Sequence, residues 1–279
     1  MKVALLGLGA MGSQMLQRLA ESGVEVTGWN RSPARAELPG ERIAPSATEA
    51  VRGADLVITM LADGSAVREV LDQAAPQPGT LVVDMSTIGP EASREIASVS
   101  ADRSVRFLEA PVSGSVGAAR RGTLTIMTGG SPEDAAEAEG VLQHLGTRVV
   151  HVGPAGTAAT LKLCVNALLH TFNTTLGQVL GVAERAGIAR ETAYDVIGVS
   201  AVAAPFVAYK REAFLAEELP PVAFTVDLVR KDLGLFLDAV ANPEQNVSAV
   251  GAAMAVVERA GQTGLGGEDM AAIARLFRP

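Results

Sequence analysis

Short apolar runs alternate with amphipathic stretches through the first half of the chain. The runs are rich in Val, Leu and Ile, which predicts strands at Val3–Leu6, Val24–Gly28, Leu56–Met60, Leu81–Met85, Val105–Glu109, Leu124–Thr128 and Arg148–Val152. The stretches between several of them predict helices at Met11–Ser22, Ser65–Leu71, Pro90–Ser100 and Pro132–Leu145. This alternation predicts an α/β fold with a mostly parallel, doubly wound sheet, whose ligand is expected beyond the carboxyl ends of the strands.

After Gly153-Pro154 only helical periodicity remains. One long helix is predicted from Thr157 to about Ala186, with Gly187 as its stop. Further helices are predicted at Arg190–Val199, Phe206–Ala216, Phe224–Ala241, Val247–Ala260 and Met270–Phe277. We therefore expect an α/β domain over residues 1–155 and an all-helical domain over residues 156–279, connected by the long interdomain helix.

A glycine motif follows the first predicted strand, with the sequence Gly7-Leu8-Gly9-Ala10-Met11-Gly12. The first glycine permits a tight turn, the second lets backbone approach a pyrophosphate, and the third lets the next helix pack closely on the strand. Phosphates then meet unpaired N–H groups at the start of a helix. The predicted strand Val24–Gly28 completes a βαβ unit, so the motif indicates a dinucleotide-binding Rossmann domain rather than an ordinary turn.

The residues after the second strand bear on which dinucleotide is bound. They are Asn30-Arg31-Ser32, and no carboxylate follows until Glu37. NAD-binding domains carry an acidic residue in this region, which accepts hydrogen bonds from the ribose 2′-OH. Arg31 instead suits a 2′-phosphate, with neutral hydrogen bonds from Asn30 and Ser32 and a share of the role for Arg35. The motif favours NADP(H) over NAD; the alternative is a solvated surface arginine.

Composition narrows the class of protein. The 279 residues are 48% hydrophobic and 19% charged, with a net charge of −8 and a single cysteine, Cys164. The negative charge disfavours nucleic-acid binding, and a small anionic substrate would need locally placed cations. No stretch reaches the roughly 18 uninterrupted apolar residues of a membrane span. One cysteine excludes an intrachain disulfide framework, which fits a cytoplasmic protein. No metal site is predicted.

Three further groups of polar residues are candidates for chemistry. Ser113-Gly114 lies in a loop that follows a predicted strand, where hydroxyl and N–H groups can bind an anion or simply form a turn. Lys162 and Asn166 share one face of the long helix, and a buried lysine there suits acid–base work, whereas one that reaches solvent does not. Lys231-Asp232 lies in another helical pattern, and the pattern alone favours an exposed, solvated pair.

The chain resembles the β-hydroxyacid dehydrogenase family, which includes 3-hydroxyisobutyrate dehydrogenases and the glyoxylate and succinic semialdehyde reductases. The resemblance runs the whole length. It rests on the glycine motif, Asp84-Met85-Ser86-Thr87-Ile88, Glu109-Ala110-Pro111-Val112-Ser113-Gly114, Gly122-Thr123-Leu124-Thr125-Ile126-Met127, Lys162 with Asn166, Lys231-Asp232-Leu233, and Gly264-Leu265-Gly266 with Asp269. It implies NAD(P)-dependent oxidation of a small hydroxyacid, or reduction of the matching semialdehyde or keto acid, by subunits that pair through the long helix as a homodimer or homotetramer.

The resemblance also implies roles for particular residues. Lys162 matches the family's catalytic lysine, a general acid and base, and Asn166 the asparagine that holds the substrate. Ser113 and Gly114 match the loop that binds the substrate carboxylate, and Phe224 is among the side chains expected to set specificity, with Phe206, Tyr209 and Leu228. The remaining cofactor contacts are expected from Leu61, Ala62, Thr87 and Lys231, a lysine that closes over the site.

The chain departs from the family pattern at three places: Ala158 before the lysine, Val165 after it, and Ala62-Asp63 after the third strand. Two other functions stay open. An imine reductase of the same superfamily usually replaces the lysine and lacks the Pro-Val-Ser-Gly loop, both of which this chain retains. The second is a non-catalytic NADP-binding protein of the same fold; such relatives lack the catalytic lysine, which this chain retains as Lys162.

Overall fold

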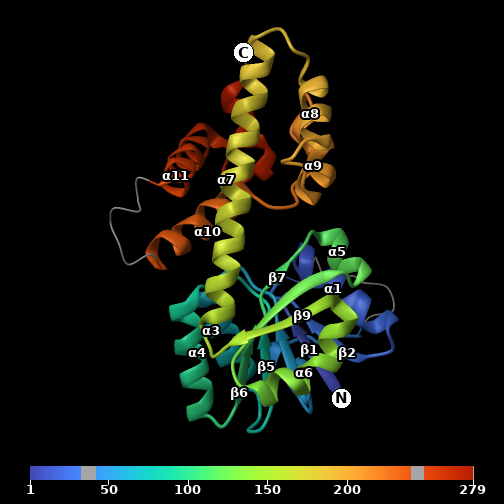
Figure 1. The fold of residues 1–279 in the computed structure, drawn as a ribbon. Coiled ribbons are helices and arrows are strands. Elements are labelled where there is room, and N and C mark those ends of the chain that lie inside the picture. The colour runs from blue at the N-terminus through green and yellow to red at the C-terminus, as the bar shows by residue number, and fades with distance from the viewer. Residues whose placement is uncertain (33–41, 240–247, 279) are drawn as a thin grey trace. The chain divides into compact units, whose positions relative to one another are not determined.

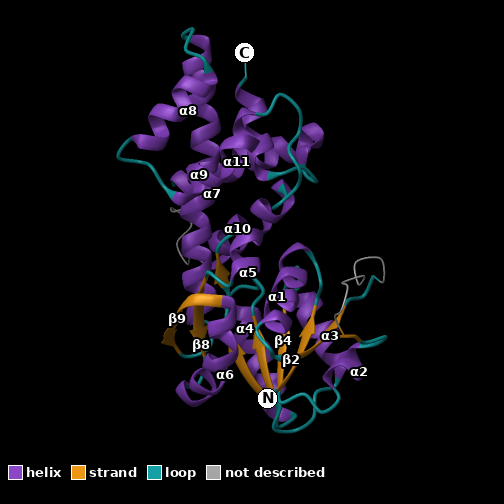
Figure 2. Cartoon of the chain, turned by 90° about the vertical axis from the view of Figure 1, so that its right-hand side faces the viewer, coloured by secondary structure: helices purple, strands orange, loops and turns teal. Residues whose placement is uncertain are grey.

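The computed structural model describes residues 1–32, 42–239 and 248–278. The chain divides into two compact units, Met1–Leu163 and Cys164–Pro279. None of the helices within the described residues is long and apolar enough to cross a membrane. The first unit contains the sheet (Figure 2). In the part of the second unit that the structure describes, the elements are helical, and Thr225 and Asp269 form a β-bridge.

The first unit is built on one mixed sheet. Its strands are β1 (Lys2–Leu6), β2 (Glu25–Trp29), β3 (Arg42–Ile43), β4 (Leu56–Thr59), β5 (Leu81–Asp84), β6 (Arg106–Glu109), β7 (Val112–Ser113), β8 (Leu124–Gly129) and β9 (Gly146–Gly153). The order is β3-β2-β1-β4-β5-β6-β8-β7, with β9 beside β8. The first six strands in this order are parallel, and β8 runs antiparallel to β6. The predicted α/β fold with a mostly parallel sheet is confirmed.

Helices cover both faces of this sheet (Figure 1). They are α1 (Ala10–Glu21), α2 (Ala47–Val51), α3 (Gly64–Ala74), α4 (Pro90–Asp102), α5 (Val116–Arg121) and α6 (Pro132–Leu145). Successive side chains of a strand point to opposite faces. On β1, Val3 and Leu5 therefore pack with α1, α5 and α6, whereas Ala4 and Leu6 pack with α2, α3 and α4.

The short elements of the first unit were not predicted. They are β3, β7, α2 and α5, each of two to six residues. So few residues do not display a hydrophobic period, and tertiary contacts fix their structure. Longer helices with side-chain caps were predicted well: the Asp63 carboxylate accepts from Ala66 N, and the Ser131 hydroxyl accepts from Asp134 N.

The long predicted helix is α7 (Thr157–Arg185), which begins in the first unit and continues in the second. Gly187 ends it, with a φ of +82° that favours glycine. The other helical elements are α8 (Arg190–Val199), α9 (Pro205–Leu215), α10 (Val226–Ala239), α11 (Ala249–Ala260), a π-helical turn η3 (Gly261–Leu265) and a 3₁₀ helix η4 (Met270–Phe277). Ala241 and Val247, the predicted ends of two helices, lie outside the described residues.

Candidate active site

The glycine turn joins β1 to α1 in a geometry that two of its glycines require. Gly7 has a φ of +104°, and a Cβ there would lie 2.4 Å from the carbonyl oxygen of Met60. A Cβ on Gly12 would lie 1.9 Å from the carbonyl oxygen of Gly7. Gly9 has no atom within 4 Å of the place its Cβ would occupy. The turn therefore leaves open space at Gly9, beside the start of α1.

The start of α1 fits a dinucleotide pyrophosphate. Gly9 is the N-cap and supplies no side-chain hydrogen bond, and no acidic residue lies in the first turn. The leading N–H groups of the helix thus carry uncompensated positive partial charge next to the open space at Gly9. A pyrophosphate is the kind of ligand that this arrangement binds, as the glycine motif predicts.

Asn30 connects the glycine turn to the residues after β2. Its Oδ1 accepts a hydrogen bond of 3.0 Å from Leu8 N, and its Nδ2 donates one of 3.0 Å to the carbonyl of Ser32. Arg31 and Ser32 are exposed. The predicted cofactor residues at positions 7–12 and 30–32 therefore belong to one connected structure, while Arg35 lies outside the described residues.

A buried aspartate ties together the loops that follow β4 and β5. Asp84 Oδ1 accepts hydrogen bonds from Thr59 Oγ1 at 2.7 Å and from Ser86 N at 3.3 Å, and Ser86 Oγ accepts one from Leu61 N at 2.9 Å. Burial raises the pKa of the Asp84 carboxyl group. This network places Leu61 beside the loop that carries Thr87, which is half-buried; Ala62 is exposed.

The loop with Ser113 and Gly114 begins at the end of β7. Ser113 pairs with Thr125 of β8 and is half-buried. Gly114 is exposed and has a φ of +144°, and a Cβ there would lie 2.8 Å from Leu124 Cδ2. The loop thus presents backbone at a position where a larger side chain would clash, which is compatible with the predicted anion-binding role.

A second buried carboxylate fixes the start of α7. Glu109, at the end of β6, accepts hydrogen bonds from Ala158 N at 2.7 Å and Ala159 N at 3.3 Å, and also from the Ser93 hydroxyl. It caps the helix from a neighbouring element, which favours its N-terminal N–H groups. Lys162 is half-buried and lies one turn beyond Ala158, so Glu109 determines where that turn lies.

In the second unit, Asp232 of α10 joins two predicted site residues. Its Oδ2 accepts a hydrogen bond of 2.6 Å from Asn166 Nδ2, and its Oδ1 lies 3.1 Å from Lys231 Nζ. Asp232 is 1% exposed, so the interpretation of Lys231-Asp232 as an exposed, solvated pair was wrong. The reason is tertiary: α10 turns the carboxylate onto the polar face of α7, which periodicity along α10 alone does not reveal.

The four residues expected to set specificity have different surroundings. Phe224 is half-buried and stacks on His170, with ring centroids 5.6 Å apart. Phe206 is buried in the core of the second unit and packs edge-on against Tyr209. Leu228 is half-buried. Phe206 therefore contributes to packing, whereas Phe224 stacks on His170, whose Nε2 lies 3.5 Å from Asp232 Oδ2.

Sequence reasoning gave no separate role to Asp84, Glu109, Asp232 or His170. The first two end apolar strand runs, and a carboxylate in that position signals a buried group that needs donors. His170 follows Asn166 by four residues on α7, so helical spacing places it on the same face. For Asp232, the side on which it packs depends on the fold.

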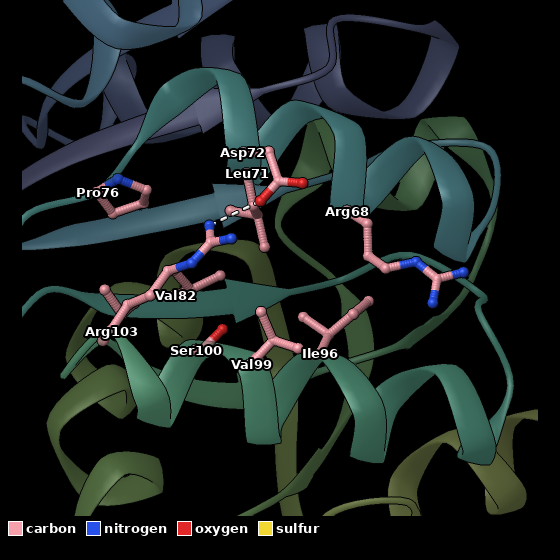
Figure 3. A pocket seen from close by; sticks show the side chains of 10 residues that line it. Arg68, Leu71, Asp72, Pro76, Val82, Ile96, Val99, Ser100 and Arg103 are labelled. Carbon is pink, nitrogen blue, oxygen red and sulfur yellow. Dashed lines mark ion pairs between the residues drawn. The ribbon is translucent and has the colours of Figure 1, made fainter.

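A crevice on the first unit lies away from these residues (Figure 3). It lies between α3 and α4, where Arg103 and Asp72 form an ion pair of 2.7 Å. Its lining includes Val82 and Val105, at the amino ends of β5 and β6. Ligands of doubly wound sheets bind at the carboxyl ends instead, so this crevice is not the candidate site.

The chain matches two family models in succession. Residues 2–153 match the NAD binding domain of 6-phosphogluconate dehydrogenase, and residues 156–277 match the NAD-binding domain of NADP-dependent 3-hydroxyisobutyrate dehydrogenase. The chain is 32% identical to 2-(hydroxymethyl)glutarate dehydrogenase of Eubacterium barkeri, over 99% of its length and 94% of that protein. It is 34% identical to a probable 3-hydroxyisobutyrate dehydrogenase of Mycobacterium tuberculosis, over 86% and 85%. A solved 3-hydroxyisobutyrate dehydrogenase from Salmonella typhimurium aligns with a TM-score of 0.91 at 26% identity, over 99% of each chain.

Proposed function

Because the chain belongs to the 3-hydroxyisobutyrate dehydrogenase-like family of NAD(P)-dependent oxidoreductases, we propose that it interconverts a small hydroxyacid and its semialdehyde or keto acid with NADP(H). It is an enzyme that acts on CH–OH groups. We further propose that residues 1–155 hold the cofactor and that residues 156–279 supply groups for the substrate and for dimerisation.

The observation that supports this function best is the pair Lys162 and Asn166 on α7, with the Asn166 amide held by Asp232 at 2.6 Å. An amide whose Nδ2 is engaged by a buried carboxylate has a fixed orientation, and it directs its oxygen to accept a hydrogen bond from a substrate hydroxyl. Lys162, one helical turn earlier, lies on the same face of the helix. This is the arrangement needed to hold a hydroxyl group and to move its proton.

The cofactor is proposed to bind along the glycine turn, with Gly7, Leu8, Gly9, Ala10, Met11 and Gly12 at the pyrophosphate, Asn30, Arg31 and Ser32 at the ribose phosphate, and Leu61, Ala62, Thr87 and Lys231 at its other contacts. When bound, it accepts or supplies the hydride. Lys162 donates a proton to the carbonyl oxygen in reduction and removes it in oxidation. Ser113 and Gly114 bind the substrate carboxylate, Asn166 and Lys231 orient the substrate, and Phe224 bounds the space for its carbon chain.

Retention of Lys162 and of the Ser113 loop weighs against an imine reductase and against a non-catalytic relative. The test is an NADPH-oxidation screen over glyoxylate, succinic semialdehyde, methylmalonate semialdehyde, tartronate semialdehyde and cyclic imines. Lys162→Ala is expected to lower kcat about 10²–10⁴-fold, the contribution typical of a positioned acid, with NADPH binding nearly unchanged. Near-wild-type kcat in this variant, or turnover of cyclic imines alone, would contradict the proposed function.

We also propose a homodimer or homotetramer formed through α7. Four apolar side chains on one face of this helix are exposed, namely Leu161, Leu168, Val179 and Val182. Exposed apolar side chains on one helix face are unfavourable in water, and a second copy of the helix would cover them. Sedimentation at micromolar concentration is expected to give at least a dimer, and a monomer would refute the proposal.

A further inference from the structure

His170 is a buried histidine with no role in the proposed chemistry. It lies on α7 one turn after Asn166 and is 1% exposed. Its Nε2 is 3.5 Å from Asp232 Oδ2, and within the described residues neither ring nitrogen has a hydrogen-bond partner. Burying an imidazole without full hydrogen bonding is costly, so an apolar residue would be the better choice for packing alone.

The polar neighbour of His170 is the carboxylate that organises the proposed substrate groups. The oxygen that faces His170 Nε2 is the one that accepts the 2.6 Å hydrogen bond from Asn166. The other oxygen lies 3.1 Å from Lys231 Nζ. The plane of the Asp232 carboxylate therefore sets the directions of both the Asn166 amide and the Lys231 ammonium group.

The face of the imidazole stacks on a phenyl ring whose backbone is held by hydrogen bonds. His170 stacks on Phe224 with an interplanar angle of 26°. Phe224 accepts a backbone hydrogen bond of 2.8 Å from Met270 N, and its own N–H donates to Asp269 Oδ2 at 3.4 Å. Lys210 Nζ holds both oxygens of that buried aspartate, at 2.6 and 2.8 Å. The imidazole thus stacks by its face on an anchored aromatic ring, and its Nε2 edge lies 3.5 Å from the Asp232 carboxylate.

We propose that His170 is a positioning residue, which holds Asp232 in the orientation that presents Asn166 and Lys231 to the substrate. The inference rests on the proposed function, because it assigns His170 an effect on substrate binding through those two residues. The ring is not required to contact the substrate. Its stack on Phe224 fixes its plane, and its Nε2 edge then limits the rotation of the carboxylate.

Two variants distinguish the contribution of the aromatic face of His170 from that of its polar Nε2 edge. His170→Phe keeps an aromatic face for Phe224 and removes the polar edge toward Asp232. His170→Gln keeps an amide donor near that edge and removes the ring. Steady-state kinetics with NADPH and either glyoxylate or succinic semialdehyde are expected to give a KM for the acid raised about tenfold in His170→Phe. The KM for NADPH is expected to change less, because Lys231 is one of several proposed cofactor contacts. His170→Gln is expected to recover most of that loss.

Thr174→Val is the matched control. Thr174 is buried one turn further along α7, and its hydroxyl bonds to the carbonyls of His170 and Thr171 within the same helix. This variant is expected to keep wild-type KM values. Thermal denaturation of every variant checks that the fold is retained.

A double variant tests the route of the effect. If His170 acts through Asp232, His170→Phe changes the KM little further in an Asp232→Asn background. The inference is overturned by a wild-type KM in His170→Phe, by equal losses in the Phe and Gln variants, or by independent effects in the double variant. Failure of the proposed function is a different result, in which the wild type turns over neither acid or Lys162→Ala retains full kcat.

Discussion

In the first unit, the groups proposed to hold the cofactor are mostly backbone N–H groups presented by a glycine turn and by loops at strand ends. In the second unit, the groups proposed for the substrate are side chains that meet across α7 and α10. Asp84 accepts its side-chain bond from Thr59, 25 residues away on the neighbouring strand. Asp232 accepts its bond from Asn166, 66 residues away.

The buried carboxylates of the two units also differ in the groups that stabilise them. Within the described residues, Asp84 and Glu109 accept hydrogen bonds from hydroxyl and N–H groups of adjacent elements and from no cation. Asp232 and Asp269 each lie against a lysine. A carboxylate that depends on one cation loses much of its stabilisation when that cation is removed. The second unit should therefore be the more sensitive of the two to single charge deletions.

The largest stability effect is expected from Lys210→Met. Asp269 is fully buried, and this change leaves its charge with backbone N–H donors alone. Breaking a buried ion pair in this way typically costs about 3–5 kcal/mol of unfolding free energy. Chemical denaturation resolves the units, because the single tryptophan, Trp29, lies in the first unit and both tyrosines, Tyr194 and Tyr209, lie in the second.

The matched control is Arg103→Met, which breaks the exposed Arg103–Asp72 pair of the first unit (Figure 3). Exposed pairs contribute about 0–1 kcal/mol, so the tryptophan transition is expected to shift little. Combining Lys210→Met with Asp269→Asn should recover part of the stability, because the unpaired charge is then gone. Equal, small losses for Lys210→Met and Arg103→Met would remove the proposed difference between the units.

The sequence predicts the features that depend on local signals better than the side-chain contacts between distant helices. The glycine turn, the parallel strands and the start and end of α6 follow from local signals, and the structure has them where periodicity places them. The long helix and its end at Gly187 were equally predictable from the sequence. Burial of Asp232 was not, because α10 carries polar residues on more than one face and only packing against α7 selects between them.

Within the first unit, Gly9→Ala and Gly12→Ala separate folding from cofactor binding. A methyl group on Gly12 overlaps backbone at 1.9 Å, so Gly12→Ala is expected to destabilise the first unit by about 1–3 kcal/mol. A methyl group on Gly9 would meet no atom within 4 Å, and the backbone of Gly9 has an ordinary extended conformation that alanine adopts readily. Gly9→Ala should therefore fold normally and still bind NADPH at least about tenfold more weakly, since it fills the proposed pyrophosphate space.

Calorimetric titration of NADPH and tryptophan-monitored denaturation measure the two effects separately. Wild-type NADPH affinity in Gly9→Ala would mean that the open space at Gly9 is not where the phosphates lie. Wild-type stability in Gly12→Ala would mean that the turn has room to relax, and that the close approach of Gly7 and Gly12 is not a constraint on the fold.

The smallest effect expected is on cofactor choice, because it depends on one exposed side chain. Arg31 follows β2, where an acidic residue would select NAD, and Asn30 fixes the local backbone by bonding Leu8 N and the Ser32 carbonyl. The wild type is expected to prefer NADPH over NADH by at least about tenfold in kcat/KM, about 1.4 kcal/mol. Arg31→Asp should reverse the preference, since a carboxylate repels the 2′-phosphate and accepts hydrogen bonds from a ribose 2′-OH. Arg52→Asp makes the same charge change at another exposed position and should leave the preference as it is. A wild type that prefers NADH, or an Arg31→Asp variant that still prefers NADPH, would show that this loop does not select the cofactor.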